Sequence, residues 1–145
     1  MAETLNYFKP VTTGQDNELV IGGTVKTGSG QSLKKVYLTL DVTNISSAAV
    51  VYLPSPVAGT ITKITTIING AIATANAILT GRIGSTTITG GAVTIPFSGS
   101  AAGQVNSTTP TALNTVDVGN NINFTANNAS TNTVRVTIVV EITLS

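Results

Sequence analysis

The sequence predicts an all-β fold, a jelly-roll-like antiparallel sandwich of about eight strands with an extended N-terminal arm. The first observation is composition, because 26 of the 145 residues are threonine and the β-branched residues Thr, Val and Ile pack well in strands. The second is an apolar period of two in several segments. The third is that these segments are short, are separated by turn residues and are accompanied by no amphipathic helical pattern.

Residues 1–32 are predicted to form an arm and linker, and residues 33–145 the sandwich domain. The arm mixes charged residues with glycine and serine and ends in the flexible sequence Thr27-Gly28-Ser29-Gly30-Gln31-Ser32. Within it, Leu19-Val20-Ile21 is expected to form one short strand next to Gly22-Gly23. The arm either packs on its own domain or lies across a neighbouring surface, and we favour the second arrangement.

The first half of the sandwich domain is predicted to contain three strands. From Lys34 the apolar period is two, so that one face holds Val36, Leu38, Leu40 and Val42 and the other Lys35, Tyr37, Thr39 and Asp41. A second strand over Ala48–Leu53 stops at Pro54-Ser55-Pro56. A third over Thr60–Ile68 ends at the turn signal Asn69-Gly70, and the following residues 71–77 are expected to form a loop.

The second half continues with short strands over Ala77–Ile83, Thr86–Thr89 and Ala92–Phe97. Residues 98–112, rich in Gly, Ser and Thr, are expected to form a long loop. Two further strands follow, over Asn114–Val118 and Ile122–Thr125. The last strand has the clearest pattern: one face holds Val134, Val136, Ile138, Val140, Ile142 and Leu144, and the other holds Arg135, Thr137, Val139, Glu141 and Thr143.

The stretch Gly81–Gly91, GRIGSTTITGG, has the glycines and hydroxyl residues of a phosphate-binding loop. A Walker loop places four residues between its glycines and then a lysine, whereas Gly81 and Gly84 are two residues apart and no lysine follows. A type II′ hairpin with Gly84-Ser85 as its two-residue loop fits better, and Gly90-Gly91 is expected to form the next corner. Arg82 then becomes a surface or intersubunit residue.

The chain contains no histidine and no cysteine. It therefore lacks the usual general base and the usual zinc ligands, and it forms no disulfide. Of the six carboxylates, Asp41, Asp117 and Glu141 lie in or beside strands and are expected to be solvated, outward-facing charges rather than a glycosidase pair. The segment Asp16-Asn17-Glu18 lacks the ligand spacing of a calcium loop. We therefore predict no enzyme, no catalytic residues, no cofactor and no metal.

Charge is scarce: 9% of the residues are charged and the net charge is +1. This balance does not indicate a strongly basic surface, so no nucleic-acid partner is predicted, and the apolar runs are too short to predict a membrane span. The start Met1-Ala2-Glu3-Thr4-Leu5 does not resemble a signal peptide, so we expect synthesis in a cytoplasm. So few charges protect a β-rich surface poorly from aggregation, which favours a role in an assembly.

The chain from Pro56 onward carries a series of turn and small-residue motifs, which are PVAGTIT, IGSTTITGG, SGSAAG, TTPTA and VGNNI, followed by the terminal strand. This series, covering about residues 50–145, resembles small β-rich virion proteins of tailed bacteriophages, above all capsid decoration (cement) proteins. The resemblance implies homotrimers on the outside of a capsid that bind the major capsid protein and staple neighbouring capsomers. It brings no catalytic residues and does not extend to the arm.

Two hypotheses follow. In the first, the protein is a decoration protein whose arm grips the capsid, since Tyr7 and Phe8 hold two of the six aromatic residues. The candidate contact residues are Tyr7, Phe8, Lys9, Leu19, Val20, Ile21, Lys34 and Lys35. The alternative is a receptor- or glycan-binding jelly-roll module of a phage tail fibre or other adhesin, for which the absence of tryptophan is a weakness.

Overall fold

The computed structural model describes residues 19–21, 24–26 and 34–145, and these fall into two parts that are described separately. In the first part, β1 (Leu19–Ile21) pairs antiparallel with β2 (Thr24–Lys26), with Ile21 opposite Thr24. The strand expected at residues 19–21 is therefore confirmed. Its partner strand β2 was not predicted from the sequence.

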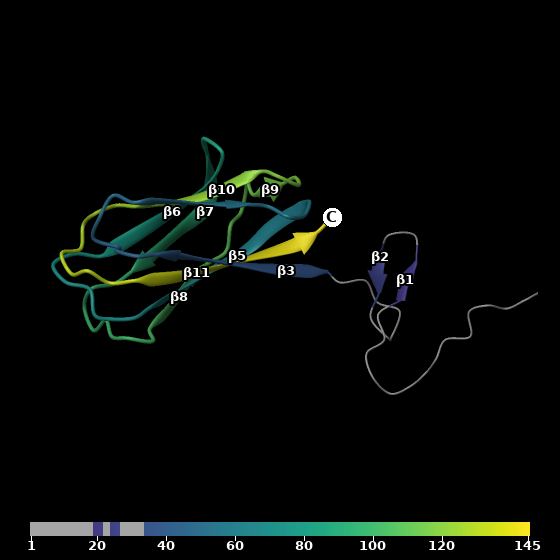
Figure 1. Ribbon diagram of the computed structural model, residues 1–145. Coiled ribbons are helices and arrows are strands. Elements are labelled where there is room, and N and C mark those ends of the chain that lie inside the picture. Colours follow the sequence, from purple (N-terminus) through teal and green to yellow (C-terminus); the bar gives the residue numbers. More distant parts are fainter. Residues whose placement is uncertain (1–18, 22–23, 27–33) are drawn as a thin grey trace, which may run out of the picture. The chain divides into compact units, whose positions relative to one another are not determined.

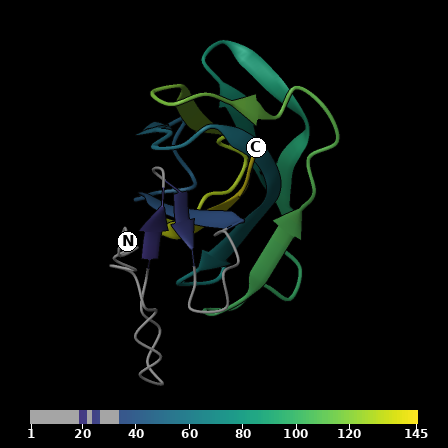
Figure 2. The same ribbon diagram turned by 90° about the vertical axis from the view of Figure 1, so that its right-hand side faces the viewer.

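The second part is a sandwich of two antiparallel sheets (Figure 1). The larger sheet has the order β3 (Lys35–Val42), β11 (Val136–Leu144), β5 (Gly59–Ile68) and β8 (Val105–Thr108), with β9 (Thr115–Val116) also paired to β5. The smaller sheet has the order β4 (Val50–Pro54), β10 (Asn121–Ala126), β6 (Ala77–Ile83) and β7 (Thr86–Ile95). Figure 2, turned by 90°, shows how the two sheets curve around the space between them.

The strand pairing is nested, as a jelly roll requires. Within the sandwich the first strand pairs with the last, β3 with β11, and the second pairs with the next-to-last, β4 with β10. Inside these lie β5 paired with β8 and, innermost, the hairpin β6–β7. The predicted all-β, jelly-roll-like antiparallel sandwich is confirmed, with the short strand β9 added to the eight strands of the nest.

The core lies between the sheets and is built by the alternation that the sequence shows. In β11, Val136, Ile138, Val140 and Ile142 are fully buried, and the intervening residues face outward. Phe124 of β10 has the largest fully buried side chain in the sandwich. The described residues form no α-helix, hence none of the length and apolarity needed to cross a membrane.

The hairpin predicted within GRIGSTTITGG is confirmed. Ile83 and Thr86 are opposite each other, so Gly84-Ser85 is a two-residue loop, and Gly84 has φ = 59°. A positive φ at the first loop position is what a type II′ turn requires and what glycine adopts without strain. The glycine therefore turns the chain between two strands.

The corner predicted at Gly90-Gly91 is wrong, because β7 runs without interruption from Thr86 to Ile95. The register between Thr80 and Arg82 shifts here, and Gly90 has φ = 70°. The positive φ lets β7 bulge instead of reversing. Within the bulge Ile88 is buried in the core and Thr89 bridges to Ala112.

The long loop predicted over residues 98–112 is also wrong in part, because β8 forms within it and pairs with β5. Its sequence VNST has a single apolar residue, so no period was visible in it. Strand formation here rests on main-chain hydrogen bonds to β5. The strand predicted over Asn114–Val118 shrinks to β9, whereas residues 71–76 are a loop as expected.

Candidate interaction surfaces

The predicted contact residues lie at the N-terminal side of the sandwich sequence. Tyr7, Phe8 and Lys9 are outside the described residues. Leu19, Val20 and Ile21 form β1. Lys34 is exposed, and Lys35 is the exposed first residue of β3. The proposed role of these eight residues in binding a partner stays a prediction.

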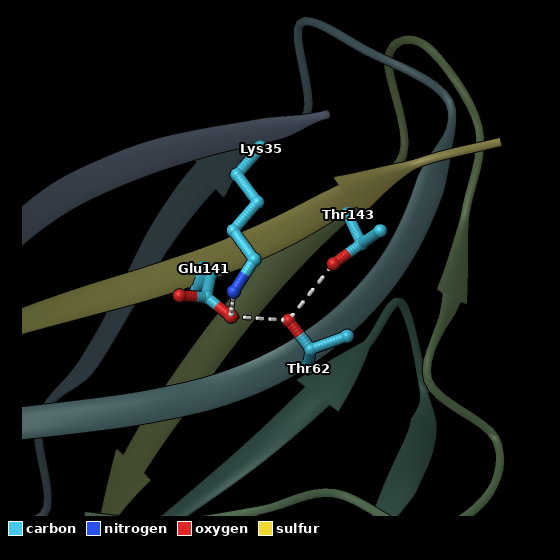
Figure 3. A network of polar contacts seen from close by, with 4 residues as sticks. All are labelled: Lys35, Thr62, Glu141 and Thr143. Carbon is cyan, nitrogen blue, oxygen red and sulfur yellow. Dashed lines mark hydrogen bonds and ion pairs between the residues drawn. The ribbon is translucent and has the colours of Figure 1, made fainter. Parts of the chain in front are cut away.

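Lys35 belongs to a polar network on the outer face of the larger sheet (Figure 3). Its Nζ donates to Oε1 of Glu141 at 2.9 Å, and the Thr62 hydroxyl donates to the same oxygen at 2.7 Å. The Thr62 and Thr143 hydroxyl oxygens lie 3.2 Å apart. The network ties together β3, β11 and β5 where β3 begins.

A β-bulge in β5 places Thr62 in this network. Glu141 is opposite Lys63 but the next residue, Ile142, is opposite Ile61, so Thr62 is the extra residue. Both Thr62 and Lys63 consequently lie outside the core between the buried residues Ile61 and Ile64. The spacing of three between these isoleucines breaks the period of two and is the sequence signal that could have located the bulge.

The pKa of Glu141 is lowered to about 2, first by the hydrogen bond from Thr62 and then by that from Lys35. The same contact with Glu141 raises the pKa of Lys35. The Glu141 side chain is 15% exposed and that of Lys35 49%, so solvent weakens their ion pair. The network therefore fixes Glu141 as a carboxylate and gives it a structural role.

Glu141→Gln is expected to destabilise the protein at neutral pH by about 1 kcal/mol, because glutamine keeps the shape and loses the charge. Since folding lowers the pKa of Glu141, its contribution is complete above the ordinary value of 4.5 and is lost as the pH falls through about 2. Urea unfolding of both proteins across this range should show the difference shrinking toward acid pH. A difference that is independent of pH would contradict the account.

Eight large apolar side chains of the described sandwich are exposed. On the outer face of the larger sheet these are Tyr37, Ile67 and Val105; on that of the smaller sheet, Val50 and Tyr52; and in the connections, Phe97, Leu113 and Val118. Ile67 of β5 is directly opposite Val105 of β8, so these two form an exposed apolar pair. Singly exposed apolar residues are common on protein surfaces, whereas neighbouring ones such as this pair mark a candidate contact surface.

The outer face of the smaller sheet has a distinct charge pattern. Its four strands contain one charged residue, Arg82 of β6. One row across the sheet consists of Tyr52, Asn123, Arg82 and Thr87, each opposite the next. Asn123 is 5% exposed although it points away from the core, and its Nδ2 donates to the Gly84 carbonyl at 2.8 Å.

A surface hollow of about 370 Å³ lies beside the β6–β7 hairpin, lined by Ile83, Thr86, Leu113 and Thr115. None of these side chains is a general acid or base at neutral pH. Nowhere in the part of the chain that the structure describes do three or more Asp or Glu side chains gather where they could hold a metal ion. The surfaces therefore offer apolar contact, hydroxyl and amide groups and a few isolated charges.

No protein-family model matches this sequence, and no curated protein matches it. Among solved structures, the fold is similar to a chain of the capsid asymmetric unit of cyanophage Pam1, with a TM-score of 0.51 and 17% sequence identity. The match covers 94% of this chain and 100% of that one. At this identity the likeness shows a common fold, and the resemblance to phage virion proteins is confirmed at that level.

Proposed function

We propose that this protein is a capsid decoration, or cement, protein, a structural virion component without enzymatic activity. It binds the major capsid protein on the outside of a phage head as a homo-oligomer, expected to be a trimer, and stabilises the head. The observation that carries the proposal is the jelly-roll fold that the chain has in common with a capsid chain of cyanophage Pam1. The exposed apolar groups on a surface with few charges support it further.

The proposed role needs no strong single contact. A protein that binds the assembled shell and not its free subunits shifts the equilibrium toward the shell by mass action. An oligomer that presents several arms gains avidity, because the second and third contacts form at high effective concentration. In this proposal the arm at residues 1–32 binds the capsid surface, and Lys34 and Lys35 follow it in the sequence where the sandwich begins.

Purified protein is expected to co-sediment with assembled heads that lack it, and to raise the temperature at which those heads fall apart. Replacing both Tyr7 and Phe8 by alanine is expected to weaken this binding at least about tenfold, because each aromatic anchor of an interface typically contributes more than 1 kcal/mol. Tyr37→Ala, at an exposed tyrosine of the sandwich, is the matched control. Quantitative sedimentation over a concentration series measures all three proteins.

The outcomes separate the parts of the proposal. Unchanged binding by the arm variant, together with loss of binding by Tyr37→Ala, would show that the sandwich and not the arm makes the contact. Failure of the wild-type protein to bind heads would refute the decoration role. Saturable binding of the same protein to a glycan array would then favour the receptor-binding module of a tail fibre or other adhesin.

A further inference from the structure

Arg82 is a cation without a counterion on an otherwise uncharged sheet face. The single ion pair among the described residues joins Lys35 and Glu141, on the other sheet. The Nε atom of Arg82 is buried and has no hydrogen-bond partner. An atom excluded from solvent cannot be reached by another molecule, but the two Nη atoms of Arg82 are not among the buried unpaired atoms and make no hydrogen bond within the described residues. These Nη atoms are open to an acceptor from outside the molecule.

The surroundings of Arg82 suit a carboxylate from a partner. A guanidinium binds a carboxylate through two parallel hydrogen bonds, and this is its most favourable protein contact. In the same row, two strands away, Tyr52 is 64% exposed and offers a flat apolar surface. None of the four strands of this sheet carries an acidic residue, so no carboxylate on them competes for Arg82.

The chain itself presents a carboxylate of the required kind. Of the three acidic residues that the structure describes, Asp41 accepts a hydrogen bond from Thr137 and Glu141 is held by Lys35 and Thr62. The side chain of Asp117, the third, bonds to no other described residue. Asp117 is exposed in the connection between β9 and β10. The next residue, Val118, is 70% exposed, the largest exposure among the large apolar residues of the sandwich. The Asp117-Val118 dipeptide thus combines a carboxylate with an exposed apolar side chain.

We propose that the Tyr52–Arg82 face of one copy binds the Asp117-Val118 dipeptide of a second copy, with Arg82 paired to the Asp117 carboxylate. Because the contact joins two different patches, it can form twice across a two-fold axis, or head-to-tail, in which case each copy offers one patch to each of two neighbours. The head-to-tail contact closes into a ring when the rotation between copies allows it. This inference deepens the proposed function, because it rests on self-association and names the contact that produces it.

Charge reversal tests the contact in the full-length protein. Arg82→Glu and Asp117→Arg are each expected to weaken self-association at least about tenfold, and the double variant is expected to restore most of it. Arg135→Glu, at an exposed arginine outside both patches, makes the same charge change and is expected to leave association unchanged. Sedimentation equilibrium over a concentration series measures the association, and circular dichroism and thermal unfolding confirm that each variant folds.

Three results would overturn the inference: a wild-type protein that stays monomeric, single variants that associate like the wild type, or a double variant no better than the single ones. The same samples are then added to heads that lack the protein. If the double variant regains self-association but the protein does not bind heads, the Arg82–Asp117 contact would be supported and the decoration role refuted. If the oligomer binds heads and its self-association is unchanged by these substitutions, the decoration role would be supported and the Arg82–Asp117 contact refuted.

Discussion

Replacing Phe124 by alanine is expected to lower the free energy of unfolding by about 3–5 kcal/mol, the usual cost of removing a buried phenylalanine. Phe124 is fully buried in β10, which lies inside the smaller sheet between β4 and β6. Its ring is also close to Gly81 of β6, where an added Cβ would come within 3.0 Å of it. Removing the ring therefore leaves a cavity bounded by paired strands, which cannot collapse to fill it.

Phe97→Ala is the matched control, since the same side chain is 45% exposed in the connection after β7. Thermal unfolding of the two variants should differ clearly, with a fall in Tm on the order of 10–20 °C for Phe124→Ala and of a few degrees at most for Phe97→Ala. Equal losses in the two variants would mean that Phe97 is buried in solution, for example in an oligomer. Phe124→Leu, which keeps most of the volume, is expected to recover much of the lost stability.

The parts of the fold that were predictable are those in which a strand separates a buried face from an exposed one. In β3 and β11 every second residue is apolar and faces the core, buried in β11 and mostly half-buried in β3, so their approximate limits and faces could be read from the period. The hairpin at Gly84 was predictable for another local reason, the requirement of a positive φ in a two-residue loop. Both signals lie within a few consecutive residues.

The parts that were not predictable depend on residues far away in the chain. β8 is a strand because its main chain pairs with β5, and its own side chains carry no period. In the bulge at Gly90, Thr89 pairs with Ala112, which lies well beyond β7 in the sequence. The nested order, with β3 beside β11, likewise follows from which strands meet and not from any local pattern.

The candidate surfaces likewise combine residues that could be named from the sequence with contacts that depend on distant strands. Lys35 was named as a contact residue, but its partner Glu141 lies 106 positions away and became visible through strand pairing alone. Arg82 was expected to be a surface or intersubunit residue because no phosphate-binding loop surrounds it. That it is the single charge of its sheet, with an unpaired buried Nε, depends on which strands form that sheet.

Gly59→Ala is expected to destabilise the sandwich by at least about 2 kcal/mol, through forced displacement of paired backbone. A Cβ at Gly59 would lie 2.3 Å from the carbonyl oxygen of Thr143 and 2.8 Å from Cγ2 of Ile142. The closest of these atoms belongs to main chain, which does not move aside as a flexible side chain does. Gly59 is also opposite Val116 of β9 and Leu144 of β11, so a shift at this residue disturbs three strands together.

Gly70→Ala supplies the control for the loss of backbone freedom that accompanies any glycine replacement. A Cβ at Gly70 would meet the Val134 side chain at 3.4 Å, an ordinary contact. Because an alanine restricts the unfolded chain, this variant is expected to be neutral or more stable by up to about 1 kcal/mol. Urea unfolding of both variants distinguishes steric displacement from a general effect of alanine. If the free energy of unfolding of Gly59→Ala equalled that of Gly70→Ala, the result would contradict a close approach of β11 to β5 at Gly59.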